Sequence, residues 1–496
     1  MSALIRRVGW DLRLQQRYGI HYAALYVAAL WLVIEFLVPA SWRAPFLPYI
    51  LFMDVAIFGL FFLPALSFLE RDERTLPALR VSPLGGARYL LARGTALLLP
   101  TLAIGLVIAA GSRVPVASWT LLIAALALTV AINLLGGFIV ASRFPSVQAY
   151  FVPAGFVLLA FQLPAIEPFI PAPADWLWLT PTYGAWRMLR AALDGPALDA
   201  TALAIALAHA AVVAAALWPF AVRAVDRFAA PTGASRWPSK ASAAGRSAAP
   251  SGEWAGWVGT LVRLDIRLVA RNAMYGFMLL ALVVLFAVVR WVLPSVEAGL
   301  APWIDLAGQR PLVWTFFGVL YIPAMIGSLV GLMLLDERDE GALLAVRATP
   351  VTLRRYLGYR MGLATAISVV YAYLGMAAFQ PMPVTVLEFA PTAVLAALET
   401  PLAALFVAGF ARNKVEGLAL TKALGAPFFA SLIAWFTPWP WRWLLAVVPT
   451  FWPAQALWWV AEGRSLAGVA AFAFVGAAFH VALIALLWRR FVRRVG

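Results

Sequence analysis

The sequence contains no cysteine among its 496 residues, so disulfide bonds and thiolate metal sites are excluded. It has only three histidines, whose spacing matches no metal-binding pattern: His21, His209 and His480. None of its three lysines follows a glycine and no G-x-x-x-x-G-K-[ST] segment occurs, so the chain lacks a P-loop for ATP phosphates. We therefore expect a protein that is not an enzyme, has no cofactor or metal of its own, and does not hydrolyse ATP itself.

Charge is also scarce, because Asp, Glu, Lys and Arg together make up only 12% of the residues. Hydrophobic residues account for 64%, and the mean hydropathy is +0.87. A soluble domain is nearer half apolar, and the apolar runs here are about 20 residues long, enough to cross a bilayer. Only helices satisfy their own backbone groups in such runs, so the composition predicts an all-α polytopic membrane protein.

The net charge of +15 could indicate a nucleic-acid partner, but its distribution favours a membrane. When the loops are assigned alternately to the two sides, most Lys and Arg lie on the side of the N-terminus. The positive-inside rule then places both termini in the cytoplasm, in a bacterial inner membrane with anionic lipid. We expect no nucleic-acid partner.

The first half begins with an amphipathic stretch at 5–19, which is typical of an interfacial helix. Six spans are then predicted, at 20–39, 46–69, 89–111, 117–141, 147–170 and 198–222. Between the fifth and sixth lies an aromatic and proline-rich segment, 171–197, which suits an interfacial or partly re-entrant structure on the outer side.

The second half repeats this plan after a Ser-, Gly- and Pro-rich stretch at 229–256 that is typical of a flexible cytoplasmic linker. Asp265 and Arg271 repeat Asp11 and Arg17, which predicts a second interfacial helix. Six further spans are predicted, at 274–294, 312–335, 356–379, 385–411, 415–437 and 465–488. The predicted domains are therefore a first half (1–228), the linker and a second half (257–496), with about twelve transmembrane helices in two parallel six-helix repeats.

Two loops, each between the second and third span of its half, carry the clearest duplication. Glu70-Arg71-Asp72-Glu73 recurs as Glu337-Arg338-Asp339-Glu340, at an offset of 337 − 70 = 267, and the likeness continues through Pro83 and Arg93, or Pro350 and Arg360. Apolar residues three apart predict a short helix with one apolar edge in each loop. Exposed ion pairs add only about 0–1 kcal/mol each, so stability alone explains the repeat poorly, and we interpret the loops as docking surfaces. The candidate residues are Glu70, Asp72, Glu73, Leu76, Leu79 and Arg80 in the first loop, and Glu337, Asp339, Glu340, Leu343, Val346 and Arg347 in the second.

The segments from Glu70 to Pro83 and from Glu337 to Pro350 resemble the corresponding loop of ABC-2 type permeases, the membrane subunits of ATP-binding-cassette exporters. The tract from Ala411 to Lys422 is similar to a stretch before the fifth span of that family, and the whole chain resembles drug exporters of the fluoroquinolone-export type. The resemblance implies two six-span permease units fused in one chain, with each loop acting as a coupling helix for an ATPase subunit. It implies a cassette ATPase dimer that binds MgATP, and the export of a hydrophobic or amphipathic small molecule or lipid. The first loop departs from the family pattern at Arg74, where glycine is usual, so the two loops are not expected to be equivalent.

Charges within the apolar spans are a second kind of candidate site, because burying them is costly. Glu399 stands in an apolar run in the second half only, where it could bind a cationic substrate or a proton, or could be a hydrogen-bonded carboxyl beside Pro401. Glu35 and Asp54 lie toward the outer ends of their spans and are expected to be interfacial. His209 and His480 are expected to be hydrogen-bonded at helix contacts.

A proton-coupled secondary transporter with 6+6 repeats is the alternative function, because such carriers also have parallel repeats. Neither repeated loop carries the G-x-x-x-D-R-x-G-R-R-like pattern that those carriers show between their second and third spans. A membrane-embedded enzyme would need clustered Asp, Glu or His at a membrane face, and the sequence has none outside the two loops.

Overall fold

The computed structural model describes residues 2–495 with gaps at 38, 74, 77–84, 171–173, 194, 230–258, 260–261, 264–272, 302–304, 307, 340, 342, 344–345, 347–351, 379–383 and 413. Helices account for nearly all of the described residues, which include no strand. The all-α prediction is confirmed. The second interfacial helix predicted around Asp265 and nearly all of the linker predicted at 229–256 lie outside the described residues.

The first half consists of the amphipathic helix α1 (Ser2–Arg17) followed by six membrane elements. These are α2 (Ile20–Leu37), α3 (Ala40–Asp72), α4 (Gly85–Gly111), α5 (Trp119–Ala141), α6 (Val147–Gln162) continued by η2 (Leu163–Phe169), and α8 (Ala200–Ala229). Helix α1 meets α2 at a bend of 73° near Gly19, whose positive φ of 75° suits a residue without a side chain. A charged helix thus gives way to an apolar one, as the sequence predicts.

The second half repeats this order. Its membrane elements are α10 (Ala273–Leu300), a span formed by α11 (Arg310–Trp314), the π-helical η5 (Thr315–Leu320) and α12 (Tyr321–Asp339), then α14 (Leu353–Ala378), the pair α15 (Val386–Ala397) and α16 (Glu399–Phe410), the pair α17 (Lys414–Ala423) and α18 (Ala426–Phe436), and α20 (Leu466–Val495). Each predicted span is helical where it is described, and most ends agree within a few residues.

Nine helices in the described part of the chain are long and apolar enough to cross a membrane, or up to ten if α1 and α2 count as one bent span. The other three of the twelve predicted spans are the bent or short ones: α2, α6 and the α17–α18 pair. Proline accompanies the last two breaks, because Pro164 stands where α6 passes into η2 and Pro427 stands in the first turn of α18. The protein is thus a polytopic membrane protein whose fifth span is interrupted in both halves.

A pair of short helices precedes the last span of each half, and the second helix of each pair is largely buried. In the first half it comprises η3 (Asp175–Leu179) and α7 (Tyr183–Ala192), and in the second η6 (Trp441–Val447) and α19 (Phe451–Ala461). Trp186 and Trp458 are among the largest fully buried side chains of the protein. The segment predicted at 171–197 is thus helical over η3 and α7, and its interfacial or partly re-entrant placement in the membrane stays a prediction.

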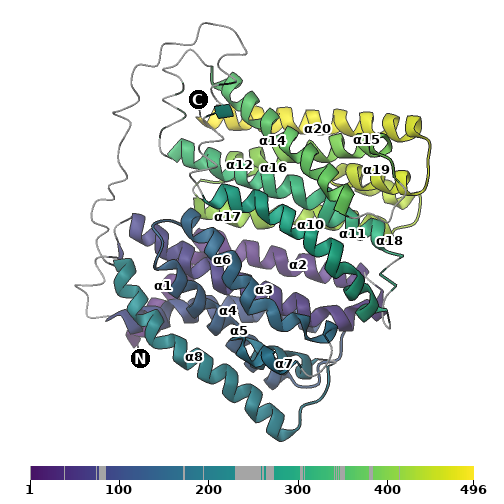
Figure 1. Ribbon diagram of the computed structural model, residues 1–496. Helices are drawn as coiled ribbons and strands as arrows, with labels where there is room; N and C mark the ends of the chain where they lie inside the picture. The colour runs from purple at the N-terminus through teal and green to yellow at the C-terminus, as the bar shows by residue number, and fades with distance from the viewer. Residues whose placement is uncertain are drawn as a thin grey trace.

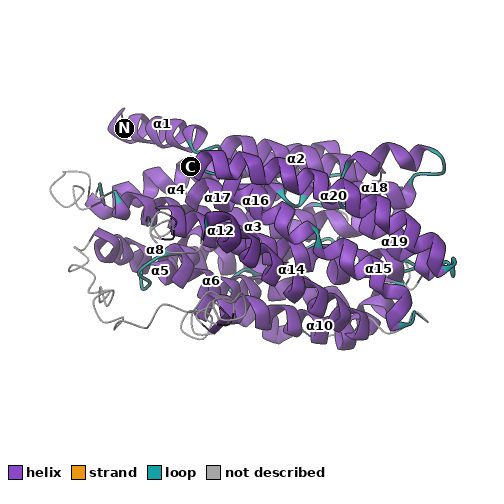
Figure 2. Ribbon diagram, turned by 90° about the horizontal axis from the view of Figure 1, so that it is seen from above, coloured by secondary structure: helices purple, strands orange, loops and turns teal. Residues whose placement is uncertain are grey.

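The two halves lie side by side, with the helices running roughly parallel across Figure 1. Both termini and the ends of α3 and α12 lie at one end of the helix bundle, here called the loop side, and the bends before α8 and α20 lie at the far side (Figures 1 and 2). The halves meet where α2 packs on α17 and α18, and where α6 packs on α10. The first span of each half therefore contacts the fifth span of the other.

Candidate functional site

The loop of the first half is anchored by a buried ionic cluster at the end of α3. The carboxylate of Glu70 accepts hydrogen bonds from the Tyr89 hydroxyl at 2.6 Å and from the Arg93 guanidinium at 2.7 Å. Arg93 is fully buried and also donates to Asp11 of α1 at 2.9 Å. One arginine thus joins α1, α3 and α4 beneath the loop.

The second half builds the same cluster at the same offset of 267. Glu337, near the end of α12, accepts from the Tyr356 hydroxyl at 2.8 Å and from Arg360 at 2.6 Å. Arg360 also donates to the Tyr356 oxygen, at 2.9 Å. The anchor triads, Glu70–Tyr89–Arg93 and Glu337–Tyr356–Arg360, therefore tie the second span to the third in both halves.

A second duplicated contact ties each loop to the connection before the fifth span. Arg338 donates to the carbonyls of Ala411 at 3.2 Å and Arg412 at 3.0 Å. Arg71 makes the equivalent bonds to the carbonyls of Phe144, at 3.2 Å, and Pro145. The positions of the acceptors are again offset by 267. Each loop, which joins the second span to the third, is thus also connected to the turn between the fourth and fifth spans.

The predicted loop residues divide into anchoring and exposed groups. Leu76 and Leu343 are 1% exposed and pack into the cores of their own halves, with Val346 partly buried beside Leu343. Glu73 and Asp339 are exposed, and Asp339 bonds Arg338. Asp72 closes α3, while Leu79, Arg80, Arg74, Glu340 and Arg347 lie outside the described residues. Leu76 and Leu343 therefore hold their loops onto the membrane domain, and the docking role of the loop residues stays a prediction.

Asp11 links the amphipathic helix α1 to this anchor. Its side chain is 1% exposed, and burial raises the pKa of the carboxyl above its ordinary value, against the attraction of Arg93 and Arg7. Arg7 lies 3.5 Å from Asp11 and 3.9 Å from Glu70. The repeat of Asp11 as Asp265 is visible in the sequence, but its partner Arg93 could not be identified from spacing.

Glu399 and His480, which the sequence presents separately, form one pair in the second half. Glu399 begins α16 at a break after Ala397, and His480 of α20 lies with its Nε2 3.1 Å from the carboxylate. The other ring nitrogen of His480 is 2.7 Å from the Gly476 carbonyl. The alternative of a hydrogen-bonded carboxyl therefore describes the geometry of Glu399. His209 of α8 bonds the Trp178 carbonyl and the Gly184 amide, as expected for a helix contact.

Glu35 and Asp54, which the sequence predicts to be interfacial, are buried by neighbouring helices, and their depth in the membrane stays a prediction. Glu35 is 3% exposed and Asp54 is 8% exposed. Both lie on helix faces that neighbouring helices cover, which their depth along the span could not reveal.

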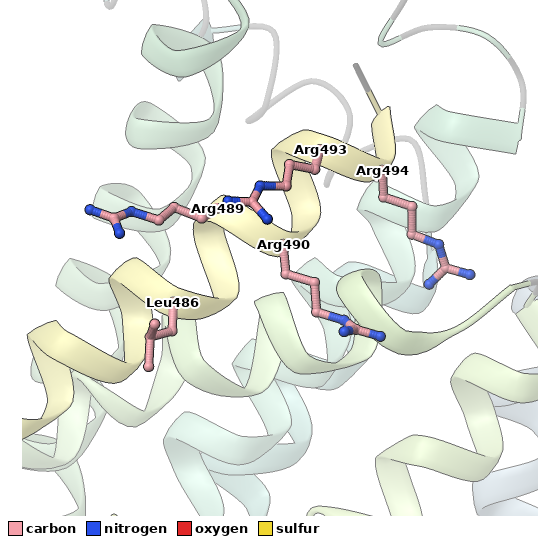
Figure 3. A pocket seen from close by; sticks show the side chains of 5 residues that line it. All are labelled: Leu486, Arg489, Arg490, Arg493 and Arg494. Atoms are coloured by element: carbon pink, nitrogen blue, oxygen red, sulfur yellow. The ribbon is translucent and has the colours of Figure 1, made fainter.

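Two hollows differ in chemistry. A nearly apolar one of about 340 Å³ lies between α3, α4, α5 and α8, lined among others by Leu91, Ala131 and Trp218. The other, of about 500 Å³, lies at the loop-side end of α20 and is lined by Leu486, Arg489, Arg490, Arg493 and Arg494 (Figure 3). Arg490 lies over the Phe410 ring, and Arg494 donates to the Gly409 carbonyl at 2.8 Å. The loop side thus carries concentrated positive charge.

Comparisons with known proteins match each half separately. Residues 2–231 match the fluoroquinolones export permease protein family, and residues 265–488 match the family described as fluoroquinolones export permease protein Rv2686c-like. The chain is 31% identical over 194 residues to the fluoroquinolones export permease protein MT2760 of Mycobacterium tuberculosis (strain CDC 1551), covering 38% of this chain and 74% of the relative. It is 32% identical over 218 residues to the fluoroquinolones export permease protein MT2761 of the same strain, covering 44% of this chain and 92% of the relative. Two permease units are therefore joined in one polypeptide, and the chain belongs to the fluoroquinolone export permease family, drug-export permeases of the ABC-2 type.

Proposed function

We propose that this permease is the membrane subunit of an ATP-binding-cassette exporter, driven by a separate dimer of cassette ATPases that binds MgATP. Each ATPase subunit docks on one duplicated loop. The permease moves a hydrophobic or amphipathic small molecule from the loop side toward the far side. Its relatives are named for fluoroquinolones, which makes that class of drug the first substrate to test.

The observation that carries this proposal is the pair of anchor triads. A loop that only solvates a turn needs no buried arginine, yet both loops rest on a Glu–Tyr–Arg cluster that joins two spans. Arg71 and Arg338 extend each connection to the fifth span, which lies at the boundary between the halves. A push on a loop anchored in this way is transmitted to helices on both sides of that boundary.

Charge supports the orientation. The arginines at the end of α20, the termini and the ends of α3 and α12 lie at the loop side (Figures 1 and 3). We propose that this side faces the cytoplasm and that the membrane is the bacterial inner membrane.

The docking proposal is tested with charge reversals at the exposed loop acids, E73K and D339K. The double variant should lose association with the cassette ATPase during co-purification, and with it drug-stimulated ATP hydrolysis. E462K is the matched control, because Glu462 is an exposed acid in the turn before α20 at the far side. An intact complex with the double variant, or equal loss with E462K, would overturn the docking proposal.

The driving force is tested in proteoliposomes that contain the complex. Drug uptake should require MgATP and should persist when an uncoupler collapses the proton gradient. Uptake without ATP that collapses with the gradient would instead identify a proton-coupled secondary transporter.

A further inference from the structure

Glu35 ends the buried stripe of α2. The buried positions of this helix include Ile20, Ala24, Val27 and Ala28, and Trp31 is partly buried one turn before Glu35. These spacings of three and four place Glu35 on the same face. The intervening residues Tyr22, Leu25 and Phe36 are exposed and form the opposite, lipid-facing side. A carboxylate thus occupies a position where the spacing of buried residues along α2 predicts an apolar side chain.

This face of α2 meets the second half of the protein. The ring centroid of Trp31, one turn before Glu35 on the same face, lies 5.7 Å from that of Phe429 on α18. The Tyr26 hydroxyl, nine residues before Glu35 and so on another side of α2, donates to the Ala423 carbonyl of α17 at 3.3 Å. Just beyond α2, Trp42 lies 5.5 Å from Phe436. Because Glu35 follows Trp31 by one turn on the same face of α2, we place it next to the contact between α2 and α18, toward the far-side end of α2.

Neither carboxylate oxygen of Glu35 has a hydrogen-bond partner among the described groups. Arg43 is a cation within electrostatic reach of the carboxylate, and its guanidinium donates to the Phe36 carbonyl at 3.2 Å. The first span of the second half, α10, carries Glu297 toward its C-terminal end, and Arg310 donates to that carboxylate at 2.9 and 2.8 Å. Of these two carboxylates, Glu35 is the one without a hydrogen-bond partner among the described groups.

A buried carboxylate without a partner is costly, and a protein keeps one only where something offsets that cost. Glu399 shows the usual solution in this chain, because it bonds His480. Glu35 lacks that solution and lies where the two halves must separate if a molecule passes between them.

We propose that Glu35 binds the protonated amine of amphipathic cationic substrates as they pass between α2 and α18. The proposal rests on the proposed transport between the halves and names its substrate class. Trp31 and Phe429 supply aromatic surface beside the carboxylate, which suits a molecule that joins a flat apolar ring to a cationic amine.

The test uses the purified full-length chain in nanodiscs, without ATPase or nucleotide. The probes are a fluoroquinolone with a free piperazine nitrogen and the same compound acetylated on that nitrogen, which removes the cation. Wild-type protein should bind the free amine about tenfold to a hundredfold more tightly than the acetylated form, the value of one charged hydrogen bond. E35Q should remove this preference and leave the affinity for the acetylated compound unchanged.

Two variants serve as controls. E399Q removes another intramembrane carboxylate, in the second half, and should retain the preference, as should R43Q. Thermal unfolding of E35Q should not fall below that of the wild type, because the substitution removes a buried carboxylate that has no hydrogen bond to lose. Equal affinity of wild-type protein for both probes, loss of the preference in E399Q or R43Q, or its retention in E35Q would overturn the assignment. If the ATPase complex is intact but the protein shows no preference for the free amine, only the assignment of Glu35 is refuted. If the preference depends on Glu35 but no ATPase associates with the chain, only the proposed cassette ATPase is refuted.

Discussion

Arg93 shows how much of this membrane protein depends on one side chain. Its guanidinium is fully buried, bonds Asp11 and Glu70, and so connects three helices from the first quarter of the chain. A buried arginine is tolerated only because it is paired, and removing a partner leaves an uncompensated charge. In the second half Arg360 is 13% exposed and its partner Glu337 is 17% exposed.

The substitution E70Q should therefore lower the free energy of unfolding by about 1–3 kcal/mol, the value of a hydrogen bond to a charged group. E337Q should cost less, because Arg360 is nearer to solvent and keeps its contact with the Tyr356 hydroxyl. Thermal unfolding of both variants in detergent measures the difference. A larger loss for E337Q would contradict the ranking.

The sequence shows which residues recur in the two halves, but it does not show which side chains they contact. The sequence alone shows that Tyr89 and Arg93 recur as Tyr356 and Arg360. That Glu70 turns inward to meet them, while Glu73 stays exposed, depends on where α4 passes α3. Spacing along one segment contains no such information.

Among the elements, the second and fourth spans of each half cross closely at small residues. A Cβ added to Gly327 or Gly331 of α12 would lie 2.5 Å from the Thr400 carbonyl or 2.8 Å from Val407 on α16. In the first half, a Cβ on Gly137 of α5 would lie 2.7 Å from the Leu60 carbonyl of α3. Close approach of backbones stabilises helix pairs in lipid, where the hydrophobic effect does not.

G331V should thus push α12 and α16 apart and lower the free energy of unfolding by about 1–3 kcal/mol, as overpacking does. Gly362 of α14 is the matched control, because an added Cβ there meets nothing within 4 Å. G362V should remain near the wild type in thermal unfolding. Equal losses would mean that glycine is needed for reasons other than this crossing.

The apolar runs of the sequence predicted the transmembrane helices almost directly, since each predicted span is a helix where it is described. What the runs could not predict is how the spans break. The break between α15 and α16 precedes Glu399, and the π-helical turn η5 interrupts the second span at Thr315. Both depend on packing: Thr315 accepts a hydrogen bond from the indole of Trp458, 143 residues away.

At the scale of the whole molecule, the halves touch in a reciprocal pattern, α2 with the α17–α18 pair and α6 with α10. Residues 1–228 and 257–496, expressed as two chains, should therefore associate and co-purify through a tag on one of them. Failure to associate, with each half folded alone, would show that the segment between them is needed for assembly and would contradict the predicted domain division.

The absence of cysteine makes the boundary directly testable. The pair W31C and F429C can be joined by a short bis-maleimide without side reactions, because their rings are in contact. Cross-linking should block drug transport, since it prevents α2 and α18 from separating, and a reducible linker should restore transport on cleavage. The single variants W31C and F429C are the controls. Transport that continues after complete cross-linking would place the substrate path elsewhere.

The fusion of two units has a further consequence for how such a protein can change. In a dimer of identical chains every mutation appears on both sides, so an asymmetric feature cannot arise. Here one messenger RNA encodes both units in equal number, and each unit can accumulate mutations independently. The Glu399–His480 pair occurs in one half, whereas the anchor triads occur in both. A screen of random variants should therefore tolerate divergence at the first kind of position far sooner than at the second.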